Sequence, residues 1–119
     1  MAYVEGFVIP VKASDRAAYL DVATKAAALF REFGALRVVE CWPDDVAHGH
    51  TTDFHRAVKV EEGEVPVFAW IEWPDRRARD AGFRAAMDDP RMAEAPMPFD
   101  GKRMIFGGFV PILDTQGEG

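Results

Sequence analysis

The sequence has a single cysteine and lacks a long apolar run. Cys41 cannot form a disulfide within the chain, which favours a reducing compartment. No apolar stretch approaches the roughly 20 residues that a membrane-spanning helix needs. The N-terminal segment also lacks the basic region and apolar run of a signal peptide. We therefore expect a cytoplasmic protein that does not bind membranes.

Basic residues are outnumbered by acidic ones. The chain has 14 Lys and Arg against 20 Asp and Glu, giving a formal net charge of −6. A broad nucleic-acid surface needs clustered basic residues, and here they are scattered, so we expect no nucleic-acid partner. The length of 119 residues and the hydrophobic share of 49% are typical of one globular domain spanning 1–119.

Four segments rich in β-branched and aromatic residues predict strands. These segments are 3–10, 36–42, 65–73 and 104–112. Helices are predicted at 14–33 and 75–87, with Ser14 and Asp75 as N-caps. Gly34 is placed for a left-handed C-cap after the first helix.

The order of these elements is βαββαβ, with an insertion at about 43–64. It predicts an α+β, ferredoxin-like fold: a four-stranded antiparallel sheet with two helices on one face. Within the insertion, Thr52 or Asp53 can begin a short helix that ends at Lys59. The sequence leaves open whether the rest of the insertion is ordered.

Both faces of the predicted sheet are apolar. In the third strand Val67, Ala69 and Ile71 point one way, while Phe68 and Trp70 point the other. Two helices cannot cover both faces, and a large exposed apolar face is unusual in a monomer. We therefore predict a homodimer in which two sheets pack face to face.

Several segments resemble the YbaA-like family of uncharacterised bacterial proteins. They are VEGFVIPV (4–11), FGALRVVECWPDDV (33–46), TDFHRAVK (52–59), VFAWIEWP (67–74), DDPRM (88–92) and MPFDGKRMIFGGF (97–109). The resemblance covers nearly the whole chain and implies a dimeric α/β barrel built from ferredoxin-like subunits. Other proteins of that superfamily include cofactor-free monooxygenases, haem-degrading enzymes and small-molecule-binding proteins. This is an analogy of fold, which does not fix the chemistry, and the cofactor stays unknown.

Three predicted strands each carry one acid within an apolar run: Glu5, Glu40 and Glu72. If the three share a sheet face, burial and like-charge proximity raise at least one pKa toward that of a general acid or base. Glu40 and Glu72 are the catalytic candidates. The alternative is that all three face water or pair with nearby cations.

Four further residues are candidates for binding a ligand. Trp42 and Trp70 can form aromatic walls for a flat molecule, with core or dimer packing as the favoured alternative. Asp45 lies where the insertion begins. Arg103 enters the fourth strand after a turn and can bind an anion, with a β-turn that forms salt bridges across a dimer as the alternative.

The insertion also holds residues of metal-binding type. His48, His50 and His55 lie near one another in sequence, but their spacing matches no closed metal site. We predict no metal site and favour an exposed turn, leaving open whether these histidines bind a metal. Cys41 could act as a nucleophile beside one of them, but a small buried side chain is the favoured alternative.

Together these features predict a homodimeric small-molecule-binding protein or enzyme acting by proton transfer or cofactor-free oxidation. Glu40 and Glu72 would be its acid/base residues. The alternative is a non-catalytic structural or regulatory dimer that docks a protein partner through 43–64.

Overall fold

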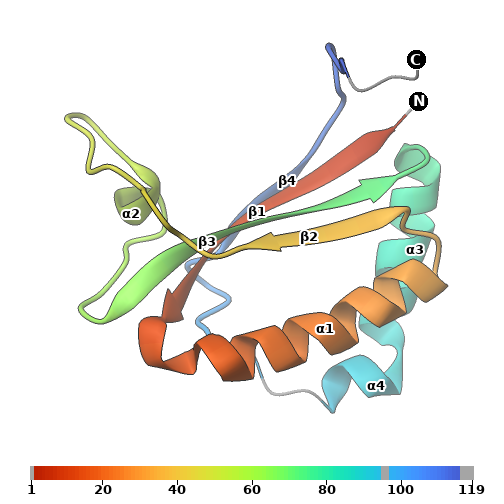
Figure 1. The fold of residues 1–119 in the computed structure, drawn as a ribbon. Coiled ribbons are helices and arrows are strands. Elements are labelled where there is room, and N and C mark those ends of the chain that lie inside the picture. Colours follow the sequence, from red (N-terminus) through yellow and green to blue (C-terminus); the bar gives the residue numbers. More distant parts are fainter. Residues whose placement is uncertain (1, 95–96, 116–119) are drawn as a thin grey trace.

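The computed structural model describes residues 2–94 and 97–115 and has one antiparallel sheet (Figure 1). Its strands are β1 (Tyr3–Lys12), β2 (Arg37–Cys41), β3 (Glu64–Trp73) and β4 (Ile105–Phe109). Their order across the sheet is β2-β3-β1-β4. This order and the connecting helices confirm the ferredoxin-like α+β fold.

The principal helices cover one face of the sheet. They are α1 (Arg16–Glu32), α3 (Arg76–Asp88) and the short α4 (Pro90–Ala93). The remaining helix, α2 (Phe54–Ala57), belongs to the insertion and lies at the opposite end of the sheet from α3 (Figure 1). Among the residues that the structure describes, no helix has the length and apolar character needed to cross a bilayer.

The start of α1 differs from the prediction. Residues Ala13–Asp15 form a 3₁₀ turn, so Asp15 rather than Ser14 takes the N-cap position, and its side chain makes no capping bond. The turn follows directly on β1, where the backbone N–H of Ala13 donates to Gly63 O at 2.9 Å. This bond to the β3 side of the sheet fixes the chain before the helix can begin.

The end of α1 confirms the predicted cap. Gly34 has φ of 115°, a left-handed conformation that glycine adopts without a Cβ clash. Its N–H donates to Arg31 O, and the N–H of Ala35 donates to Phe30 O, which is the Schellman pattern. The chain then turns directly into β2.

Asp75 caps α3 as predicted, because its Oδ1 accepts the N–H of Ala78 at 2.8 Å. The helix packs closely on the sheet through Gly82, where an added Cβ would clash with the Trp73 ring and the carbonyl oxygen of Phe33. Trp73 is fully buried. Gly82 therefore sets the spacing between α3 and the end of β3.

The alternation of the strands follows the predicted pattern. Val67, Ala69 and Ile71 are buried beneath the helices, whereas Phe68 is 44% exposed on the other face. Phe109 of β4 is 63% exposed on that same open face. The insertion meets one end of this face, where the rings of Phe54 and Phe68 lie 6.1 Å apart.

The insertion is ordered around Asp53, which caps α2 by accepting the N–H of Arg56. The helix is shorter than predicted, because Lys59 has a positive φ of 50° and turns the chain toward β3. The fourth strand is also shorter than predicted. Its pairing with β1 runs from Ile105 to Phe109, and Pro111, which lacks a backbone donor, follows shortly after.

Candidate functional site

A cavity of about 290 Å³ lies between the sheet and α1. Its volume is close to the lower end of the range for small-molecule sites. Small side chains of α1 leave this space, and the segment 97–104 closes part of it. Its lining residues are Phe7, Ile9, Tyr19, Val22, Ala23, Ala26, Ala27, Phe30, Val38, Glu40, Ala69, Ile71, Phe83, Met87, Met92, Met97, Phe99, Gly101 and Met104.

Tyr19 and Glu40 supply the polar side chains of that lining. The Tyr19 hydroxyl donates to Glu40 Oε1 at 2.6 Å, the short distance expected for a bond to an ionised acceptor. Tyr19 is buried on the sheet-facing side of α1, and Glu40 projects from the edge strand β2. The pair therefore joins the helix to the sheet at the rim of an apolar space.

Burial raises the pKa of the Glu40 carboxyl above its usual range, and the hydrogen bond from Tyr19 opposes part of that rise. Burial and the neighbouring Glu40 charge raise the pKa of Tyr19 as well, so the phenol keeps its proton. The residue Glu40 as a whole is exposed at the sheet edge, while its carboxylate reaches inward to Tyr19. It can thus exchange a proton with solvent and also face a molecule in the cavity.

The three strand acids do not gather at one layer. Glu5 and Glu40 lie on the helix-covered face, whereas Glu72 alternates with the buried Ile71 and Trp73 and projects from the open face. Glu72 accepts a hydrogen bond from Trp70 Nε1 at 2.9 Å and lies 3.6 Å from Arg37 Nη1. Glu40 and Glu72 of one chain are therefore not a catalytic pair.

Glu5 is buried, and its carboxylate forms an ion pair with Arg79. The Arg79 guanidinium donates to its carboxylate and stacks over the Tyr3 ring, 4.9 Å from the ring centroid. This ion pair joins β1 to α3. The sequence analysis missed Arg79 as a partner, because the two residues are 74 positions apart.

The two candidate tryptophans, Trp42 and Trp70, lie on opposite sides of the sheet. Trp42 packs beside the cluster that includes Ile9 and Tyr19, with the Arg16 guanidinium 5.5 Å from its ring. Trp70 lies on the open face, with its ring 5.8 Å from that of Phe68. The two residues cannot form one aromatic wall within a single chain.

Arg103 is held within the protein. Its guanidinium donates to both oxygens of Glu64, at 2.6 and 2.9 Å, and to Asp100 at 3.0 Å. These bonds lower the pKa of Glu64 to about 2. The salt bridges that the alternative places across a dimer are formed here within one chain. Asp45 is exposed on the insertion.

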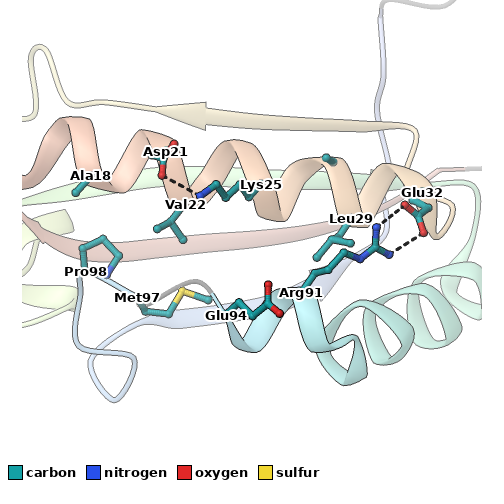
Figure 2. Close-up of a pocket in the computed structure, with 11 residues that line it drawn as sticks. Ala18, Asp21, Val22, Lys25, Leu29, Glu32, Arg91, Glu94, Met97 and Pro98 are labelled. Carbon is teal, nitrogen blue, oxygen red and sulfur yellow. Dashed lines mark hydrogen bonds and ion pairs between the residues drawn. The ribbon is translucent and has the colours of Figure 1, made fainter.

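A wider, charged groove lies between α1 and α4 (Figure 2). Four of its charged side chains form ion pairs: Lys25 lies 3.3 Å from Asp21, and Arg91 lies 2.9 Å from Glu32. Val22 and Met97 line both the groove and the cavity, so the two spaces adjoin.

Tyr19 is a site residue that the sequence did not predict to be functional. It lies within the predicted helix 14–33, at helical spacing from Ala23, Ala26 and Phe30. The signal for its role is a hydroxyl group on a helix face otherwise made of Ala and Phe side chains. A buried tyrosine hydroxyl needs a hydrogen-bond partner, and Glu40 supplies it.

The fold and the cavity define the class of this protein: a ferredoxin-like α+β subunit with an apolar, small-molecule-sized space beneath its helices. The chain belongs to the family described as "Protein of unknown function (DUF1428)", whose model matches residues 2–101. It is 58% identical over 116 residues to the uncharacterized protein YbaA of Escherichia coli K12, covering 96% of this chain and 99% of YbaA.

Two solved structures share the fold at low identity. One is SnoaB, a cofactor-independent oxygenase from Streptomyces nogalater, at 18% identity and a TM-score of 0.63, covering 98% of each chain. The other is an uncharacterized NIPSNAP domain protein from Burkholderia xenovorans, at 17% identity and a TM-score of 0.55, covering 92% of this chain and 93% of that one. These likenesses establish the fold alone.

Proposed function

We propose that the protein binds a small, largely apolar organic molecule in the cavity beneath α1, and that Glu40 exchanges a proton with it. The observation that carries this proposal is the Tyr19–Glu40 pair in the wall of an otherwise apolar cavity. A carboxyl with a raised pKa is suited to act as a general base or acid near neutral pH.

The chemistry follows from the surroundings of Glu40. Among the residues described, Tyr19 is the only hydrogen-bond partner of the Glu40 carboxylate, and that bond uses Oε1. Oε2 is therefore available to accept a proton from an acidic O–H or C–H of the bound molecule. Tyr19 holds the carboxylate in position and stabilises its charged form.

The bound molecule would be left as an anion, and Glu40 would return the proton to it or to solvent. Such a proton abstraction is the first step of an isomerisation, and it also produces an electron-rich anion that O₂ can oxidise. The second route is supported by the fold shared with SnoaB, which is described as a cofactor-independent oxygenase. The geometry of this chain favours the proton transfer itself.

We further propose that the protein acts as a homodimer through the open face of its sheet. Phe68, Ile105 and Phe109 are each more than 40% exposed there in a single chain. A second copy would cover this apolar face, as the sequence pattern predicts. Trp70 and Glu72 are then assigned to the interface instead of the cavity.

A thermal-shift screen tests the proposal with phenols, aromatic ketones and short fatty acids as probes. A ligand at a hundredfold excess over Kd adds about 2.7 kcal/mol of stability. We expect wild type to respond to acidic apolar probes, with a response that depends on pH. Glu40→Gln should remove that pH dependence, whereas Glu62→Gln, on an exposed turn, should behave as wild type.

A stable dimer that responds to no probe would contradict the proposal and favour the non-catalytic alternative, a dimer that docks a protein partner. If a probe is also turned over, Glu40→Gln should lower the rate by about 10²–10⁴-fold. Turnover that is unaffected by this substitution would remove Glu40 from the mechanism.

A further inference from the structure

Three metal-ligating side chains meet on the insertion between β2 and β3. His48, Asp53 and His55 each offer one ligand atom, and these atoms lie within 4.8 Å of one another. The Nδ1 atoms of His48 and His55 each lie 3.8 Å from an oxygen of the Asp53 carboxylate. Both distances are longer than a hydrogen bond, so neither imidazole uses its Nδ1 to bind Asp53 directly.

His55 and Asp53 both present buried polar atoms that an additional ligand could satisfy. His55 Nδ1 is buried and has no hydrogen-bond partner among the residues described. The Asp53 side chain is only 3% exposed, although it carries a charge. A buried polar atom left without a partner destabilises the fold, so such atoms are uncommon in folded proteins.

We propose that His48, Asp53 and His55 bind one divalent transition-metal ion, with water completing its coordination. Imidazole nitrogen and carboxylate oxygen together suit zinc and iron. When an ion lies about 2.1 Å from each of two ligand atoms that are 3.8 Å apart, the ligand–metal–ligand angle is about 130°. This spacing allows one ion to contact the aspartate and a histidine at an angle somewhat wider than tetrahedral.

Binding requires one movement. The rings of His48 and His55 are stacked with centroids 4.2 Å apart, so both Nδ1 atoms cannot point at one ion while the stack persists. The His48 side chain is 78% exposed and can turn out of the stack without disturbing the core. His55 and Asp53 stay in place, because they belong to the buried side of the cluster.

The rest of the loop is already held in shape. Asp53 accepts the N–H groups of Gly49 and Arg56, at 3.0 and 2.7 Å. The Arg56 guanidinium in turn donates to the carbonyl oxygens of Gly49 and His50, both at 3.0 Å. Such outer hydrogen bonds orient metal ligands. The Arg56 charge lies 3.7 Å from Asp53 and opposes a cation, so we expect weaker binding than in a site with only anionic neighbours.

This site is separate from the cavity beneath α1, because none of its three residues lines that cavity. The sequence predicted an exposed turn without a metal here. The sequence pattern assigns Asp53 to the start of a short helix and does not identify it as a metal ligand. Metal binding at this site therefore does not depend on proton transfer by Glu40, and the two proposals can be tested separately.

Isothermal titration with zinc chloride tests the proposal on tag-free protein that has been treated with EDTA and then exchanged into chelator-free buffer. We expect wild type to bind one zinc ion per chain. His48→Ala should weaken binding at least tenfold, because it removes a ligand from an exposed position that the fold does not need. His50→Ala is the matched control in the same loop: His50 contributes only its backbone oxygen to Arg56, and zinc binding should match wild type.

Two outcomes would overturn the proposal: wild type that takes up no zinc, or His50→Ala that loses as much affinity as His48→Ala. Binding to cobalt(II) gives a second readout, since its visible absorption reports the ligands directly. We expect a cobalt spectrum in wild type and in His50→Ala that disappears in Asp53→Asn, with circular dichroism used to verify that this variant is folded. A cobalt spectrum unchanged in folded Asp53→Asn would also contradict the assignment.

Discussion

Tyr19 and Glu40 are 21 positions apart in the chain and meet through one hydrogen bond of 2.6 Å. This contact joins the N-terminal end of the cavity's helical wall to an edge strand. Burial raises the pKa of both groups, and the contact raises the pKa of Tyr19 further while it opposes part of the rise at Glu40. Several measurable properties depend on it.

The raised pKa of Glu40 should appear in the pH dependence of stability. A carboxyl whose pKa is higher in the folded state than in the unfolded state stabilises the fold at low pH. This contribution is lost as pH rises through the folded-state pKa. We expect the melting temperature of wild type, relative to Glu40→Gln, to fall as pH increases above the ordinary glutamate value. A constant difference between the two proteins across pH 4–8 would show that the Glu40 pKa is not raised.

Glu64 should show the opposite behaviour. Its pKa is lowered to about 2 by the Arg103 guanidinium, so its stabilising contribution is present above the usual glutamate pKa of 4.5. That contribution should be lost as pH falls from about 4.5 to about 2. We expect Glu64→Gln to flatten the acid side of the stability curve, as measured by urea unfolding. Equal acid sensitivity in both proteins would contradict the ion pair.

Filling the cavity should abolish binding while keeping the fold. Ala26 lines the cavity from α1, and Ala26→Met places added apolar atoms in that space. We expect probe affinity to fall by tenfold or more, with little loss of thermal stability. Ala17→Met is the control on the exposed side of the same helix. If both variants keep wild-type affinity, the probe binds elsewhere.

A charge on the open sheet face should separate the proposed dimer. We expect Phe109→Glu to shift the mass measured by light scattering from that of a dimer to that of a monomer. Leu20→Glu introduces the same charge at a position that is 59% exposed on α1, away from that face, and should leave the dimer intact. A monomeric wild type, or a dimer that survives Phe109→Glu, would contradict this interface.

Gly82→Ala should destabilise the fold. The added Cβ would overlap the Trp73 ring and the Phe33 carbonyl oxygen, and such overpacking costs about 1–3 kcal/mol. Gly101→Ala is the matched control, since its added Cβ meets no atom within 4 Å. Chemical denaturation of the two variants gives the comparison. Equal stability would show that α3 can shift away from Trp73.

The strand faces and one helix cap could be predicted from the sequence, because they depend on local patterns. Burial in a strand repeats every second residue, so Ile71 and Phe68 could be assigned to opposite faces before the structure was known. The same rule places Glu72 on the face opposite Ile71, but only the pairing of Glu40 with Ala69 in the structure places Glu40 on the other face from Glu72. The Asp75 cap followed from its position before a helical segment, whereas Ser14 failed because the 3₁₀ turn at Ala13–Asp15 delayed the helix.

The candidate site was harder to predict because its contacts are distant in sequence. Glu40 was identified as an acid in an apolar strand, but its partner Tyr19 depends on how α1 crosses the sheet. Arg103 was identified as an anion-binding candidate, and the structure instead supplies Glu64 and Asp100 as its anions. Side-chain pairing across elements is set by tertiary packing, which a local pattern does not contain.

The register of β1 also constrains how the chain folds. Tyr3 pairs with Trp73 on one side of this strand, and Val4 pairs with Phe109 on the other. The central strand β1 is therefore synthesised before β3 and β4, the two strands that pair with it. Pairing across such sequence distances carries a loop-closure cost and slows folding. A nascent chain that stops before β4 would leave one edge of β1 unpaired, an open template for association with other unfinished chains.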